Sequence, residues 1–298
     1  MKEKYSGKKR LFSPDGFGHT EIMKIIVLGS GTSHGVPVIG CGCPVCTSDD
    51  PGDKRMRSSI YIEGPGGECV VIDTGPEFRL QALRAGIRRL DAIFLTHAHA
   101  DHIHGLDDVR ALSWNKPIPI YGNEQTIVEM EERFSYVWRE TQEGGGKPRL
   151  LPRVISGPVC VGGLTFTPVP VKHGILDILG WKIEEGAGKS FLYLTDTSAI
   201  PSASFRQLNY EVSPPIRIII IGGLRERPHE THFSFEQALN VALELGAEKT
   251  YLTHICHEHS HREIDEFCRK FIEKLQAPDQ KSNSMECHPA YDGLELTL

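Results

Sequence analysis

The sequence lacks any hydrophobic run long enough to cross a membrane. Its longest purely aliphatic stretch is Ile218 to Ile221, whereas a membrane-spanning helix needs roughly 20 apolar residues. No apolar segment follows the basic residues 8–10, so we expect no signal peptide, no membrane partner and a cytoplasmic location. Positive charge is not in excess either. The formal net charge of −6 argues against a general nucleic-acid-binding protein, which normally has a basic face.

The chain has eight cysteines, but without a secretion signal we do not expect a disulfide framework. Three of them lie close together, at Cys41, Cys43 and Cys46, which in a reducing compartment indicates metal binding. The others are spread along the chain. Cys69, Cys160 and Cys268 lie in apolar or helical contexts and are predicted to be core residues, whereas Cys287 has no assigned role.

We expect a polar extension at residues 1–22 and one domain at residues 23–298. Helix and strand signals occur in both halves without a strict βαβ alternation, which favours an α/β (α+β) fold of two facing sheets with helices outside. Ser234 and Gln237 have the spacing of a helix-capping box. Strands are expected at residues 24–28, 59–63, 69–72, 92–95, 118–121, 164–171, 178–183, 191–194, 216–221, 250–252 and 294–297; helices at residues 77–85, 105–114, 124–138, 235–245 and 262–275; and a surface loop at residues 143–148.

Four potential metal ligands follow the apolar run at residues 91–96. A helix cannot present so many ligands on one face, because neighbouring residues point about 100° apart. A tight loop after a buried strand can direct them toward two adjacent points. Imidazole and carboxylate ligands together suit zinc, manganese or iron. The four residues are His97, His99, Asp101 and His102.

Three later apolar runs each end in a further potential ligand, at His173, Asp196 and His254. A single histidine at a strand end is more often structural. Together with the first four, however, they make five histidines and two aspartates, a number that fits two cations, which in such pairs lie roughly 3.5–4 Å apart.

This pattern of motif and following ligands resembles the metallo-β-lactamase superfamily, from about Met23 to the C-terminus. The resemblance implies an αββα sandwich with two metals at one edge. It also implies that His97, His99 and His173 hold the first metal, that Asp101, His102 and His254 hold the second, and that Asp196 bridges them; Asp101 is assigned a catalytic role as well. Asp73 matches an early aspartate of the family, which usually orients a ligand histidine.

The Cys41-x-Cys43-x-x-Cys46 loop is similar to that of phosphoribosyl 1,2-cyclic phosphate phosphodiesterases, a branch of the same superfamily. There the three thiolates share a structural zinc with a histidine just past the last active-site ligand. That resemblance implies His257 as the fourth ligand, with Cys256 as its competitor. A related cysteine loop also occurs in a cofactor-biosynthesis branch whose active site is degenerate.

Several further residues are candidates for contact with a substrate. The resemblance makes His232 the candidate general acid, although nearby His229 is an alternative, and an anion would suit the helix N-terminus that follows. His34 is predicted to line the pocket. For Arg57 and Arg225 we favour structural roles. His104 is placed beside the site without ligating, and His259 and His261 are assigned to the surface.

We therefore predict a hydrolase that binds two catalytic divalent metals, manganese or zinc with iron as a third candidate, and one structural zinc. Its expected substrates are small phosphodiesters, cyclic ribose or nucleotide phosphates, cleaved by metal-activated hydroxide. Alternatives are an RNA-processing nuclease of the superfamily and a zinc-stabilised, non-enzymatic biosynthesis-accessory protein. Lactone or thioester hydrolysis stays open. A homodimer is considered because related enzymes are often dimers; the physiological substrate and the catalytic metals are not fixed.

Overall fold

A computed structural model describes residues 22–140, 146–186, 188–210, 216–275 and 285–298. Apart from Ile22, the expected extension at residues 1–22 lies outside the described residues, as do residues 143–145 of the expected loop at residues 143–148. Within the described part, no helix is both long enough and apolar enough to cross a membrane.

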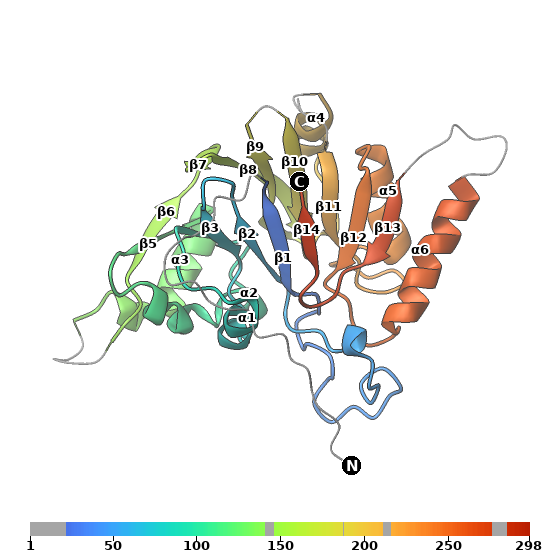
Figure 1. Ribbon diagram of the computed structural model, residues 1–298, viewed down its shortest axis with the longest axis horizontal. Helices are drawn as coiled ribbons and strands as arrows, with labels where there is room; N and C mark the ends of the chain where they lie inside the picture. Colours follow the sequence, from blue (N-terminus) through green and yellow to red (C-terminus); the bar gives the residue numbers. More distant parts are fainter. Residues whose placement is uncertain (1–21, 141–145, 187, 211–215, 276–284) are drawn as a thin grey trace, which may run out of the picture.

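The strands form two seven-stranded mixed sheets that face each other, with helices on the outside (Figure 1). The first sheet has the order β14-β1-β2-β3-β4-β5-β6 and the second the order β13-β12-β11-β10-β9-β8-β7. The first comprises β1 (Lys24–Gly29), β2 (Ser59–Glu63), β3 (Cys69–Ile72), β4 (Ala92–Phe94), β5 (Ile118–Gly122), β6 (Leu150–Val154) and β14 (Glu295–Thr297); the second comprises β7 (Val159–Val161), β8 (Leu164–His173), β9 (Leu176–Glu185), β10 (Lys189–Leu194), β11 (Ile216–Gly222), β12 (Lys249–Thr253) and β13 (Glu286–Pro289).

The predicted αββα arrangement is confirmed. The α-helices are α1 (Phe78–Ala85), α2 (Ala100–Ile103), α3 (Glu124–Arg133), α4 (Ser202–Tyr210), α5 (Phe235–Glu244) and α6 (His261–Leu275), and the 3₁₀ segments are η1 (Pro51–Asp53), η2 (Leu106–Leu112) and η3 (Ser135–Val137). The capping box at the start of α5 is present, with both Ser234 and Gln237 side chains bonded to backbone.

Some elements differ from the sequence-based expectation. The helix expected at residues 105–114 is the 3₁₀ segment η2, which buries Leu106 and Val109; their spacing of three residues fits the 3₁₀ turn. The sequence did not predict β6, β7, β13 or α4. All three of these strands lie at a sheet edge, where the hydrophobic pattern is weak and proline is tolerated. Two of them, β6 and β13, contain a proline.

Aromatic side chains fill the space between the two sheets. Phe94 stacks on Phe166 at a centroid distance of 4.1 Å and meets Trp181 edge-on at 4.8 Å. All three are fully buried. The chain that leaves β4 after Phe94 therefore starts from a fixed position.

Cys69 and Cys268 are buried as predicted, but Cys160 is exposed, because β7 is an outer edge strand that packs against β8 alone.

We expect the Phe94→Ala variant to lose about 3–5 kcal/mol of unfolding free energy, because it deletes the ring that joins the two sheets. Urea denaturation of the two proteins measures the difference. Leu83→Ala on α1 is the matched control, since Leu83 is 66% exposed, and it should change the unfolding free energy by less than about 0.5 kcal/mol. Equal losses in the two variants would show that the inter-sheet stack does not stabilise the fold.

Candidate metal centre

The predicted ligand loop is a tight turn held against a neighbouring loop. His99 precedes the single-turn helix α2, which carries Asp101 and His102. Thr74 N donates to the carbonyl of His102 at 2.7 Å, and Gly105 N donates to the carbonyl of Thr74 at 2.8 Å. A Cβ atom at Gly105 would lie 2.1 Å from the Gly75 carbonyl oxygen, so this close approach of two backbones requires glycine.

The seven predicted ligands converge in two adjacent groups, although they come from both sheets. The first group is His97, His99 and His173; the second is Asp101, His102, Asp196 and His254, and within each group the ligand atoms lie within 4.8 Å of one another. Asp196 Oδ2 lies 3.2 Å from His102 Nε2 and 3.0 Å from His254 Nδ1. Asp196 also groups with His173 of the first set, which is the position a bridging carboxylate needs.

Two imidazole nitrogens in these groups have no hydrogen bond, as ligands of a metal require. His97 Nε2 and His102 Nε2 are buried, and neither has a hydrogen-bond partner. His102 Nε2 lies 3.2 Å from carboxylate oxygens of Asp101 and Asp196, but it is not aligned to bond to either. Buried polar groups normally have partners, so two unpartnered nitrogens are what a site built to hold cations would contain.

The other nitrogens of the ligand histidines are engaged by the protein. His102 Nδ1 lies 2.7 Å from Asp73 Oδ2, and His173 Nδ1 donates to the carbonyl of Thr231 at 2.8 Å. His254 Nε2 lies 3.1 Å from Thr32 Oγ1. Contacts of this kind fix the orientation of an imidazole and raise its strength as a ligand. Asp73 therefore lies where it was predicted to act.

Three of these residues have left-handed backbone conformations, which side-chain-bearing residues rarely adopt. Asp73, Asp196 and His254 have φ values of 62°, 53° and 56°, and they are the non-glycine residues with positive φ in the described part of the chain. Such conformations cost about 1–3 kcal/mol each and persist where the surroundings impose them. All three lie just past a strand end, so the strain aims their side chains at the site.

The charges in the centre are mutually compensating. Although burial would raise the pKa of Asp196, the imidazoles of His254 and His102 hold it well below its ordinary value. Burial would lower the pKa of His102, but Asp196, Asp101 and Asp73 hold it well above its ordinary value. His97 has a lowered pKa because it is buried and lies beside His102. A neutral His97 is the form that binds a cation.

The predicted thiolate site is also assembled. His257 Nδ1 lies 3.4 Å from Cys41 Sγ, 3.4 Å from Cys43 Sγ and 3.5 Å from Cys46 Sγ. A tetrahedral zinc with bonds of about 2.3 Å to sulfur and about 2.0–2.1 Å to nitrogen places these atoms about 3.6 Å apart. The four residues therefore fit zinc. The competing ligand, Cys256, is not in this group.

Thiolate character is unevenly distributed among these cysteines. A hydrogen bond from the Cys46 backbone, followed by one from His257, lowers the pKa of Cys43 to about 6. Burial raises the pKa of Cys46 to about 11, although the Val38 N–H, 3.3 Å from its sulfur, opposes this. A zinc ion therefore has to displace protons from this site in order to bind.

His232 lies at the mouth of the metal centre. Its ring centroid is 4.7 Å from that of His173 and 4.8 Å from that of His254, and its Nδ1 lies 3.8 Å from Asp196 Oδ1. Burial, with a contribution from His254, lowers its pKa to about 3, so it is neutral near pH 7 in the metal-free protein. His229 lies farther from the ligand groups. Its ring centroid is 5.2 Å from that of His232, and its Nδ1 accepts a hydrogen bond from Thr231 N.

The structure corrects or limits several smaller expectations. The N–H groups at the start of α5 are bonded to Ser234 and to the Arg225 carbonyl, so this end offers little to an anion. His34 is exposed, and its role stays a prediction. As favoured, Arg57 pairs with Glu77 and Arg225 with Glu258. His259 and His261 are half-buried rather than exposed, because they pack against Phe235 and Tyr291.

Sequence reasoning missed residues that hold the ligand loops. Asp292 accepts hydrogen bonds from Ser30 N at 2.9 Å and Met56 N at 2.8 Å, and Ser58 Oγ lies 3.3 Å from His254 Nδ1. These polar residues lie in loops without a motif or periodicity. The Asp292-Gly293 pair is a turn signal, but nothing in it indicates the distant partners.

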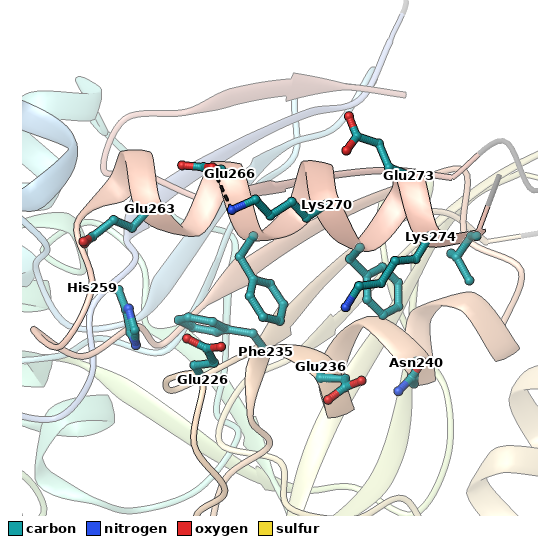
Figure 2. Close-up of a pocket in the computed structure, with 13 residues that line it drawn as sticks. Glu226, Phe235, Glu236, Asn240, His259, Glu263, Glu266, Lys270, Glu273 and Lys274 are labelled. Atoms are coloured by element: carbon teal, nitrogen blue, oxygen red, sulfur yellow. Dashed lines mark ion pairs between the residues drawn. The ribbon is translucent and has the colours of Figure 1, made fainter. Parts of the chain in front are cut away.

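A hollow of about 1070 Å³ lies between α5 and α6 (Figure 2). Phe235 and the partly buried Phe267 and Phe271 contribute to its lining, and glutamates and lysines surround them. None of the metal-ligand groups lines it. We place the chemistry at the ligand clusters because orphaned imidazoles and strained backbone occur there, whereas the hollow has neither feature.

We expect Asp73→Asn to weaken metal binding at the second group about 10–100-fold. Asparagine keeps the size of the side chain and tolerates a left-handed backbone, but it lacks the charge that holds His102. Competition of Mn²⁺ against a chromophoric chelator measures the affinity. Asp177→Asn, which alters the exposed pair with Lys172, is the control and should behave as wild type. Unchanged affinity in the Asp73 variant would rule out an orienting role.

Comparisons with known proteins agree with this geometry. A family model described as a beta-lactamase superfamily domain matches residues 69–255. A curated octanoyltransferase of Porphyromonas gingivalis is 38% identical over 279 residues, which is 93% of this chain and 52% of that protein. The chain thus spans about half the length of that relative. Coenzyme PQQ synthesis protein B of Methylobacterium radiotolerans is 31% identical over 113 residues, covering 34% of this chain and 37% of that protein.

Solved structures give the same result. A diphosphatase of the PhnP family is 38% identical with a TM-score of 0.76, over 92% of this chain and 97% of that one. Zn²⁺-bound PqqB from Methylobacterium extorquens, at 18% identity, has a TM-score of 0.69 over 92% of this chain and 100% of that one, and likeness at that level shows the fold alone. The family model, which matches more than half of the chain, shows that the chain belongs to the metallo-β-lactamase superfamily.

Proposed function

We propose that this protein hydrolyses small phosphodiesters, with cyclic ribose or nucleotide phosphates as the expected substrates, at a pair of divalent cations. The observation that carries the proposal is the convergence of all seven ligand residues, with two buried imidazole nitrogens left without hydrogen bonds. The PhnP-family diphosphatase supports the choice of a phosphorus substrate and adds phosphoric anhydrides as a second class.

In this proposal His97, His99 and His173 hold one cation, Asp101, His102 and His254 hold the other, and Asp196 contacts both. Manganese, zinc and iron all suit imidazole and carboxylate ligands. When bound, such a pair lowers the pKa of water and offsets the charge of the phosphate. Asp73, Thr231 and Thr32 keep the ligand imidazoles in fixed orientations. The Cys41, Cys43, Cys46 and His257 group takes the structural zinc.

His232 is the proposed proton donor to the leaving group. It lies at the mouth of the centre and is partly exposed, so a substrate can reach it. Its pKa of about 3 means that it carries no proton to give at pH 7 until an anionic substrate raises that pKa. Asp101, as a ligand at the same centre, completes the catalytic residues that we propose.

The competing functions have weaker support. The short form of human tRNase Z is 16% identical with a TM-score of 0.62, which shows the fold alone. In this chain β9 and β10 occupy most of the stretch between His173 and Asp196, and among its described residues there is no inserted arm that could hold RNA. A non-enzymatic accessory role has no need of a complete ligand set. Hydrolysis of an octanoyl thioester is included in the test because of the octanoyltransferase relative.

We expect the metal-loaded protein to hydrolyse 2′,3′-cyclic nucleotides, ribose cyclic phosphate and bis(p-nitrophenyl) phosphate, and to lose activity after chelation. Nucleoside diphosphates, an octanoyl thioester and precursor tRNA complete the panel. Asp196→Ala should fall to the background rate with reduced metal content, because it removes the shared ligand. Hydrolysis of the thioester without hydrolysis of any phosphate ester would overturn the proposal, and full activity of Asp196→Ala would overturn the bridging role.

His232→Gln should slow alkyl phosphodiesters about 10²–10⁴-fold, the usual contribution of a general acid or base, and slow activated aryl esters much less. The reason is that a poor leaving group needs a proton, whereas p-nitrophenolate does not. The ratio of kcat/KM for the two ester classes measures the effect. His229→Gln is the matched control. An equal loss for both classes would assign His232 to substrate binding, and a larger selective loss in the control would transfer the role to His229.

A further inference from the structure

Arg55 is a buried cation between two loops that carry metal ligands. It is 2% exposed and lies between the cysteine loop and the 3₁₀ segment η1 on one side and the chain after β12 on the other. A buried charge is tolerated only when it is paired and hydrogen-bonded. The partners of Arg55 therefore show what it holds in place.

The guanidinium binds backbone on both sides of His257. Its Nη1 donates to the carbonyl of Cys256 at 2.6 Å, and its Nη2 donates to the carbonyl of His259 at 3.0 Å. Its Nε donates to the carbonyl of Gly52 at 3.3 Å. Because the two carbonyls flank His257, the guanidinium fixes the backbone segment that presents this imidazole to the cysteines.

The backbone of Arg55 holds the opposite half of the thiolate site. Arg55 and Val36 exchange two backbone hydrogen bonds, each 2.8 Å long, at the start of the cysteine loop. Asp53 Oδ1 lies 3.3 Å from Arg55 Nη2 and accepts a hydrogen bond from His261 N at 2.7 Å. One residue thus joins the cysteine loop to the segment from Cys256 to His261.

A proposed ligand of the catalytic pair lies just before this segment. His254 is two residues before Cys256, and its strained backbone has to be held by its neighbours. Ile255 N donates to the carbonyl of Ser30 at 2.9 Å, and Thr32 N donates to the carbonyl of Ile255 at 3.2 Å. Any displacement between the cysteine loop and residues 255–257 would therefore shift the His254 imidazole.

We propose that Arg55 is a positioning residue that couples the thiolate zinc site to the catalytic cation pair through the carbonyls of Cys256 and His259. A zinc held by these four residues would fix the cysteine loop. Arg55 joins that loop to the chain after β12, and a fixed His254 imidazole would bind a cation more tightly. The inference rests on the metal assignments of the proposed function and is independent of the substrate. The planar guanidinium can donate to both carbonyls at once, whereas the single ammonium group of lysine cannot, so lysine is a poor replacement.

The test is a double-mutant cycle on Mn²⁺ affinity, measured by electron paramagnetic resonance without substrate. The four proteins are wild type, Cys41→Ser, Arg55→Met and the double variant. We expect each single variant to bind Mn²⁺ at the catalytic pair at least 10-fold more weakly, and the double variant to bind no more weakly than the weaker single one. Such non-additivity is the signature of two residues acting through one path.

Arg55→Lys, which keeps the charge, is measured in parallel and replaces Arg55→Met if that variant does not fold. Arg227→Met is the matched control, because Arg227 pairs with Glu258 beside His257 but contacts neither carbonyl; it should bind Mn²⁺ within twofold of wild type. Wild-type Mn²⁺ affinity in Cys41→Ser, or multiplicative losses in the double variant, would overturn the coupling. A purely structural role would lower stability while leaving the losses multiplicative.

The two proposals can fail separately. Coupling is read from Mn²⁺ binding alone, so a protein that hydrolyses none of the phosphodiesters can still show it. Conversely, the protein can hydrolyse phosphodiesters while its Mn²⁺ affinity is unchanged by variants of the cysteine loop. That result would support the proposed function and rule out the proposed role of Arg55.

Discussion

The arrangement of the metal centre depends on the Asp196 carboxylate. It lies within 3.2 Å of two imidazoles from different sheets, His102 beyond β4 and His254 beyond β12. Burial would raise the pKa of this carboxylate, but the imidazoles of His254 and His102 hold it well below its ordinary value, and Asp196 in turn helps to hold the pKa of His102 above its own. The facing of the two sheets brings these partners together, so the packing between the sheets and the electrostatics of the centre depend on each other.

The positions of the three later candidate ligands were predictable from sequence because each ends an apolar run. A buried strand is visible as a hydrophobic stretch, and the polar residue after it must lie at the sheet edge, as His173, Asp196 and His254 do. The Cys-x-Cys-x-x-Cys loop was visible for a similar reason, since its spacing is local. His257 required the family resemblance, because nothing in the sequence measures its distance to a loop more than 200 residues earlier.

The residues that sequence reasoning missed act through backbone atoms at long range. Arg55 donates to carbonyls, and Asp292 accepts from N–H groups, and every residue other than proline has both groups. The sequence therefore does not show which backbone groups take part in such contacts. The edge strands β6 and β13 escaped for a related reason, because a strand with one paired side and a proline has little of the pattern by which strands are recognised.

The position of Asp292 links completion of the centre to a residue that follows every candidate ligand in the sequence. This residue lies between β13 and β14, and it fastens Ser30 and Met56 next to the residues that orient His254. A polypeptide still emerging from the ribosome contains all of the candidate ligand histidines before it contains Asp292. The centre can therefore be complete only after residue 292 has been synthesised, and a chain that stops before Asp292 lacks the hydrogen bonds that hold the loops around His254.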